Sequence, residues 1–236
     1  MSPWWRRSPP RPRNSVAGAV RRLHSIAPLW HTGGVLALLA LLSGFMVYVR
    51  MGSTTSRIGH LPSYAIIIAG EWVVFAVTLW GSHTAFVGYV ARVLQDPRSL
   101  LWDLPVAVIL ATVLVFMSPA IVRVMGSEGW ASLQGMLPTT GVEIAAWIVM
   151  SITAGICEET IFRGYLQQQI SGWTGHIVIG IIGQAAVFGL CHAYQGWKKV
   201  VLIFVWGCVF GACAWLREGL RANMVAHAAL DIFSAF

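Results

Sequence analysis

The sequence predicts an all-α fold, a polytopic membrane helix bundle with about seven transmembrane helices. Of its 236 residues, 57% are hydrophobic and only 11% are charged, whereas soluble domains carry about 25% charged residues. The apolar residues gather in runs of the length that crosses a bilayer, roughly 17–25 residues. The alternating apolar pattern of outer-membrane barrel strands is not seen in the sequence. Helices are therefore the expected elements, because each satisfies its own backbone hydrogen bonds in lipid.

Polar or Gly- and Pro-containing connections separate the expected spans. In chain order, these spans cover residues 30–49, 61–82, 103–122, 141–160, 176–193, 199–216 and 221–236. The last segment is short enough to be either a span or a re-entrant helix. We therefore divide the chain into a basic tail (1–28), amino-terminal transmembrane helices (29–139) and a carboxyl-terminal transmembrane core (140–236).

The formal charge of +7 is concentrated ahead of the first span. The arginines there are Arg6, Arg7, Arg11, Arg13, Arg21 and Arg22. The tail is long and Pro-rich and has no small-residue cleavage site, which distinguishes it from a signal peptide. Its charge favours a disordered cytoplasmic segment that obeys the positive-inside rule over a nucleic-acid-binding region. We expect the amino end in the cytoplasm and no nucleic-acid partner.

Cysteine spacing excludes two structural classes. The four cysteines are Cys157, Cys191, Cys208 and Cys213, and none forms a CxxC pair. Neither a disulfide framework nor a zinc knuckle is therefore indicated. We interpret the cysteines as small buried packing residues.

Ionisable residues interrupt the most hydrophobic part of the chain. They are Glu158, Glu159, Arg163, His192, His227 and Asp231. Insertion scales assign roughly 2.5–3.5 kcal/mol to a charged side chain at the bilayer centre, so such residues usually mark a functional site. Their recurrence at helical spacings predicts chemistry within the membrane.

Local signals place these groups at similar depths. Thr140 and Glu143 form a capping box at the start of the fourth span, and nothing ends that helix before residues 171–175. A turn there sends the chain back antiparallel. At 1.5 Å per residue, the acid pair and His192 then lie within about two helical turns of a common depth. The last segment reaches the same region, so we expect a single site in the cytoplasmic half of the bilayer.

Spacing also divides the roles of the two adjacent acids. Glu159 and Arg163 stand at i and i+4 and face the same side of a helix, whereas Glu158 projects about 100° away. We expect Glu159 to pair with Arg163 and fix the helix. Glu158 would face a cavity as general base, because desolvation makes a carboxylate a better proton acceptor. His192 could orient the attacking water with Glu158.

A His–Asp pair and a further glutamate could also contribute to this site. His227 and Asp231 repeat the i, i+4 spacing, and on one helical face they could donate to an oxyanion or bind a metal. Glu71 lies in the second span without a partner at helical spacing. An interhelical hydrogen bond is the favoured interpretation of Glu71, and lining of the cavity is the alternative.

Three short motifs occur in order along the core. They are Glu158-Glu159 with Arg163, Phe188 with His192, and His227 with Asp231. They resemble the motifs Glu-Glu-x-x-x-Arg, Phe-x-x-x-His, and His-x-x-x-Asn or Asp of the CPBP family. This family comprises membrane proteases related to type II CAAX prenyl endopeptidases and to bacteriocin self-immunity proteins. The resemblance covers residues 140–236.

The resemblance implies hydrolysis of a peptide bond by a glutamate-activated water. It assigns the water to Glu158 and His192, and the oxyanion to His227 with residue 231. Asp231 departs from the prenyl proteases, which carry Asn there. An ionised aspartate would repel an oxyanion, so Asp231 must be protonated, orient His227 or bind a metal. A metal-free mechanism is favoured. Zinc stays the alternative, and its ligands would be Glu158, His192, His227 and Asp231.

We therefore expect a multi-pass membrane endopeptidase of a prokaryotic cytoplasmic membrane, acting on a membrane-associated or lipidated protein. One alternative is a non-catalytic membrane partner, such as an immunity, chaperone or scaffold protein. Another is an ion transporter that uses buried Glu and His side chains as ligands. The transporter is disfavoured because the sequence shows neither an inverted repeat nor paired broken helices.

Overall fold

The computed structural model describes residues 25–50, 58–81, 100–126 and 135–236, and every regular element in these ranges is a helix. The predicted all-α class is confirmed, while most of the expected tail lies outside the described residues. The elements are α1 (Leu29–Arg50), α2 (His60–Trp80), α4 (Leu100–Met125), α5 (Gly141–Glu158), η4 (Glu159–Leu166), α6 (Gln167–Thr174), α7 (Ile177–Cys191), η5 (Ala193–Gln195), α8 (Trp197–Arg217) and α9 (Arg221–Phe233).

Within the described ranges, five helices are long and apolar enough to cross a bilayer. They cover Leu29–Tyr48, His60–Trp80, Leu101–Met125, Gly141–Thr174 and Trp197–Arg217. The protein is therefore a multi-pass integral membrane protein. Seven spans are not confirmed, because α7 has 15 residues and α9 has 13, and a helix of that length rises only about 20–22 Å against a hydrocarbon core of about 30 Å.

The surface of α4 shows where lipid would lie. Its large exposed apolar side chains include Leu104, Val108, Ile109, Phe116 and Val124. A continuous apolar face of this kind on a long helix is typical of a membrane surface. Inside the bundle, by contrast, polar and charged side chains are buried.

The helix that begins at α5 is continuous through η4 to the end of α6. The predicted capping box is present: the amide of Glu143 donates to Thr140 Oγ1 at 3.3 Å, and the amide of Thr140 donates to Glu143 Oε2 at 3.1 Å. The helix ends at Gly175, whose φ of 71° is the left-handed conformation that favours glycine. Its middle section, η4, is π-helical and almost wholly buried. Such sections are rare and often lie at functional sites.

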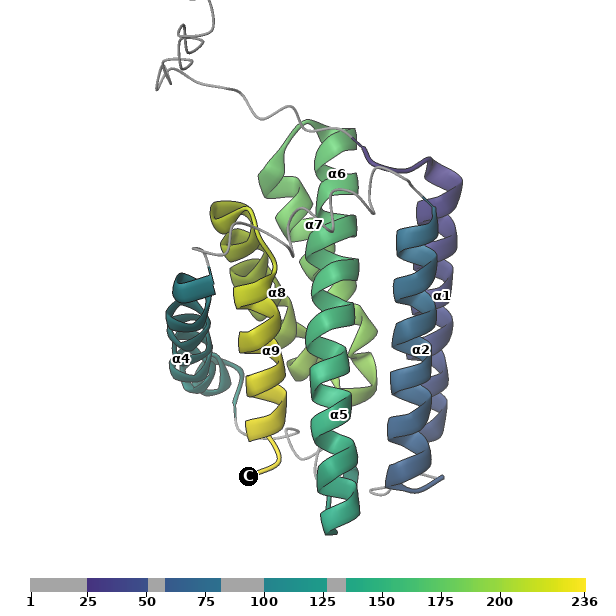
Figure 1. Ribbon diagram of the computed structural model, residues 1–236, viewed down its shortest axis with the longest axis vertical. Helices are drawn as coiled ribbons and strands as arrows, with labels where there is room; N and C mark the ends of the chain where they lie inside the picture. The colour runs from purple at the N-terminus through teal and green to yellow at the C-terminus, as the bar shows by residue number, and fades with distance from the viewer. Residues whose placement is uncertain (1–24, 51–57, 82–99, 127–134) are drawn as a thin grey trace, which may run out of the picture.

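The other helices surround α5 (Figure 1). The pair α1 and α2 lies on one side of α5, and α9 packs on the other side with α4 beyond it. Helices α7 and α8 pack together, and α7 also packs on α6. One interior region therefore lies among three segments of the chain. These are the junction of α5 and η4, which carries the two acids, the end of α7, and α9.

Close contact between α5 and α9 determines where the last motif lies. Gly155 faces α9 so closely that a Cβ there would lie 2.7 Å from the carbonyl oxygen of Met224 and 3.0 Å from Ala228 Cβ. The indole of Trp147 on α5 donates to the carbonyl of Asp231 at 2.9 Å. At the other end of α9, Arg221 Nε lies 2.7 Å from Asp103 Oδ2 on α4.

Replacement of Gly155 by alanine is expected to push α9 away from α5. Overpacking of this kind costs about 1–3 kcal/mol, so thermal unfolding of the detergent-solubilised protein should occur at a lower temperature. Gly34→Ala is the matched control, because a Cβ at Gly34 meets nothing within 4 Å. Equal stability of the two variants would contradict the proposed contact.

Candidate active site

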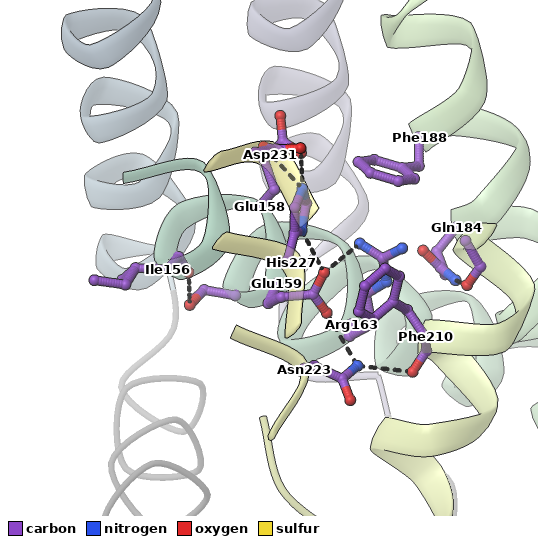
Figure 2. Close-up of polar contacts among 12 residues, drawn as sticks. Ile156, Glu158, Glu159, Arg163, Gln184, Phe188, Phe210, Asn223, His227 and Asp231 are labelled. Atoms are coloured by element: carbon purple, nitrogen blue, oxygen red, sulfur yellow. Dashed lines mark hydrogen bonds and ion pairs between the residues drawn. The ribbon is translucent and has the colours of Figure 1, made fainter. Parts of the chain in front are cut away.

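A fully buried ion pair lies at the start of η4. Arg163 Nη1 donates to Glu159 Oε1 at 2.9 Å, and both side chains have an exposed fraction of 0%. His227 Nδ1 donates to the same oxygen at 2.9 Å, and Asn223 Nδ2 donates to Oε2 at 3.1 Å. Figure 2 shows the Glu159 carboxylate among these three donors. Three hydrogen bonds, one of them from a guanidinium, thus stabilise Glu159 as an anion.

The arginine of this pair also contacts the aromatic residue of the second motif. Its guanidinium carbon lies 4.3 Å from the ring centre of Phe188 and 5.1 Å from that of Phe210. Cation–π contacts of this length hold a guanidinium in a dry site. Arg163 therefore fixes η4, α7 and α8 against one another, and Figure 2 shows it between the two rings.

Glu158, the preceding residue, lines a partly open cavity of about 160 Å³. The ionisable residues and tyrosine that line this cavity are Glu71, Glu158, His192, Tyr194, Lys199, His227 and Asp231. A volume of about 10–15 Å³ suffices for one water molecule, so the cavity has room for several waters. The structure thus places the two adjacent acids in different surroundings.

His227 connects the two acids. Its Nδ1 is bonded to Glu159, while its Nε2 lies 3.4 Å from Glu158 Oε2 and 3.6 Å from Asp231 Oδ2. The latter two distances exceed the usual 2.7–3.2 Å range of an N–H···O hydrogen bond. They leave the Nε2 edge available toward the cavity that Glu158 and Asp231 line.

The orientation of His192 is fixed by its own helix. Its Nδ1 lies 2.8 Å from the carbonyl oxygen of Phe188, and because a carbonyl only accepts, Nδ1 must carry the proton. Nε2 is then the ring nitrogen of a neutral His192 that can accept a hydrogen bond. The Phe188 ring packs edge-on against His192 with centroids 4.9 Å apart, and Tyr194 stacks on it at 6.0 Å.

The structure therefore brings the residues of all three sequence motifs together. Sequence reasoning missed Asn223, Tyr194 and Phe210 as members of the site. Asn223 has a local signal, because it precedes His227 by four residues and shares its helical face. Phe210 has none, since its contacts with Arg163 and His227 depend on the way α8 packs on η4 and α9. Tyr194 stacks on His192, its neighbour two residues away, but that spacing does not predict a cavity wall.

The zinc alternative does not fit this arrangement. In the part of the chain that the structure describes, no three His, Cys, Asp or Glu side chains are placed to hold a metal ion. No step is therefore derived through a metal.

Fold and site together define a class: a multi-pass membrane protein with an acid–base site buried among its helices. Residues 140–233 match the family model of type II CAAX prenyl endopeptidases, Rce1-like, so the chain carries a domain of this family. The predicted CPBP resemblance over the carboxyl-terminal core is thereby confirmed. No curated protein and no solved structure matches the chain.

Removal of Arg163 is expected to destabilise the protein strongly, because it leaves Glu159 buried without its cation. Breaking a buried pair costs about 3–5 kcal/mol, so Arg163→Met should lower the midpoint of thermal unfolding in detergent. The double variant Glu159→Gln with Arg163→Met should recover part of that loss. Arg217→Met, at a partly exposed pair with Asp103, is the control and should cost about 1 kcal/mol or less. Similar losses of stability for Arg163→Met and Arg217→Met would refute the conclusion that the Glu159–Arg163 pair is buried and stabilises the fold.

Proposed function

We propose that the protein is an intramembrane endopeptidase that hydrolyses a peptide bond of a membrane-associated or lipidated protein. The observation that carries this proposal is the shared cavity of Glu158 and His192, backed by the fixed Glu159–Arg163 pair. A base and a hydrogen-bond acceptor beside space for water are what activation of a water molecule requires. The family of the 140–233 domain supports the same reaction.

In this mechanism Glu158 takes a proton from a water molecule in the cavity. His192 accepts a second hydrogen bond from that water at Nε2, because its Nδ1 is bonded to the carbonyl of Phe188. The oriented water then attacks the scissile carbonyl carbon. Glu159 does not exchange protons, since all its donors hold it as an anion.

His227 is the proposed donor to the oxyanion that forms on this attack. Its Nδ1 proton is engaged with Glu159, and Nε2 points between Glu158 and Asp231. A doubly protonated imidazole there can donate from Nε2 to a developing negative charge. The side chain of Asp231, which is 38% exposed, orients His227 and balances its charge. This assignment favours the orienting role of Asp231 over a metal-binding one.

The cellular setting follows from the composition of the chain. The basic tail favours an amino end in the cytoplasm, which would place the site in the cytoplasmic half of the membrane. Lipid-anchored proteins present their modified ends at that level of the bilayer. Such an end is the proposed substrate.

Substitution of the water-activating residues is expected to abolish substrate processing. Glu158→Gln and His192→Ala should each reduce turnover by about 10²–10⁴-fold, the usual contribution of general base catalysis. Membrane insertion and expression should not change. Processing can be followed by capturing proteins bound to Glu158→Gln and testing their cleavage by the wild-type protein in proteoliposomes.

Cys191→Ser is the matched control for these variants, because Cys191 directly precedes His192 without belonging to the proposed chemistry. It should retain activity. Full processing by both Glu158→Gln and His192→Ala would refute the protease proposal and favour a non-catalytic membrane partner. Loss in Cys191→Ser alone would point to a thiol nucleophile.

Metal removal is expected to leave the activity intact. Prolonged treatment of the purified protein with 1,10-phenanthroline or EDTA, followed by dialysis, should change the turnover rate by less than about twofold, because none of the proposed steps uses a metal. Loss of activity that added zinc restores would contradict this mechanism and revive the zinc alternative.

A further inference from the structure

A third carboxylate faces the proposed reaction centre from outside the family domain. Glu71 lies in the middle of α2 and is 6% exposed. Its Oε2 is fully buried and has no hydrogen-bond partner among the residues that the structure describes. A buried polar atom left without a partner costs about 1–3 kcal/mol, so its retention calls for a function. The interhelical hydrogen bond favoured by the sequence does not account for Oε2.

Glu71 lies where two cavities meet. The cavity of about 160 Å³ and a second one of about 60 Å³ share Glu71, Glu158, His192, Tyr194 and Ile67 in their walls. The rest of the smaller cavity is mainly apolar, with side chains from α1 and α2. Glu71 and Glu158 therefore face the same space from opposite sides of the α2–α5 contact.

The charges around this space limit how many acids can ionise together. Glu71 interacts electrostatically with Glu158 and with Asp231. The Arg163 cation is engaged by Glu159, which leaves His227 and Lys199 as the other basic groups beside His192 in the wall of the larger cavity. Like-charged carboxylates in one low-dielectric site share protons, because they cannot all ionise. The cluster therefore retains at least one proton.

We propose that Glu71 carries this proton and is the general acid of the reaction. This inference rests on the proposed protease function. Water adds its oxygen to the carbonyl carbon, and its proton passes to Glu158. When the C–N bond breaks, the nitrogen takes a proton from Glu71 and leaves as an amine. A proton then moves from Glu158 to Glu71 through cavity water, and both acids return to their starting states.

Glu71 suits this role better than the other acids of the site. Glu159 is held as an anion by its three donors, and Glu158 is needed as the base. Asp231 is 38% exposed and lies beside His227, where an anion stabilises the imidazolium. Glu158 Oε2 is also buried without a hydrogen bond, but it lies 3.4 Å from His227 Nε2, whereas Glu71 has no such ion pair among the residues that the structure describes.

The kinetic test uses two probes with the same acyl part, a lipidated peptide amide and its p-nitrophenyl ester. An amine leaves only with a proton, whereas p-nitrophenolate leaves without one. Glu71→Gln should therefore lower kcat on the amide by about 10²–10⁴-fold and on the ester by less than about tenfold. Glu71→Asp should restore part of the amide activity. Glu143→Gln, which preserves the capping box, is the control and should resemble the wild type.

The outcomes separate this inference from the protease proposal. Equal losses on amide and ester in Glu71→Gln, or no loss on either, would overturn the general-acid role alone. Glu158→Gln should be inactive on both probes, because both need an activated water. Full activity of Glu158→Gln would instead overturn the protease function itself.

A second measurement needs no substrate. Infrared spectra of the purified protein at neutral pH should contain the C=O stretch of a buried protonated carboxyl group. Glu71→Gln should remove that band, Glu71→Asp should shift it, and Glu143→Gln should leave it unchanged. A band that persists unaltered in Glu71→Gln would show that another acid holds the proton and would overturn the proposal.

Discussion

The buried pair of Glu159 and Arg163 is the interaction on which the rest of the site depends. Neither side chain is exposed, so each would carry a large desolvation cost without the other. Groups from several helices surround the pair: His227 and Asn223 of α9 donate to the carboxylate, and aromatic rings of α7 and α8 flank the guanidinium. Because these partners are spread over the fold, the pair forms properly only when the whole bundle is assembled.

This arrangement explains why two adjacent acids can differ in chemistry. Glu159 accepts hydrogen bonds from three fixed donors, while its neighbour Glu158 lines a cavity with room for water. His227 lies 3.4 Å from Glu158 and 2.9 Å from Glu159, and it thereby links the buried ion pair to the cavity. The π-helical section η4 begins at Glu159. The backbone geometry therefore changes at the position where the surroundings of the two acids differ. The fixed ion pair next to Glu158 holds the backbone in place, and this keeps the Glu158 side chain positioned toward the cavity.

The amino-terminal helices complete the site. Glu71 of α2 lines the cavity from outside residues 140–233, the part of the chain that matches the family model. A separate polar network holds α1 in place: His31 donates from Nε2 to the carbonyl of Val77 at 2.9 Å, so its Nδ1 accepts from the Tyr165 hydroxyl at 2.6 Å. The side chain of Gln169 on α6 accepts from the backbone amide of Ile26 ahead of α1. These hydrogen bonds hold α1 and α2 against η4 and α6.

The sequence by itself determined the helices, most of their ends, the capping box at Thr140 and the three motifs, because hydrophobic runs, caps and i, i+4 spacings are local properties. It also separated the directions of Glu158 and Glu159. Only the tertiary structure decided that α7 is shorter than a bilayer-spanning helix, that η4 is π-helical, and that Glu71 lines the same cavity as Glu158. Those features depend on which helix faces meet, and periodicity along one helix carries no information about its partner.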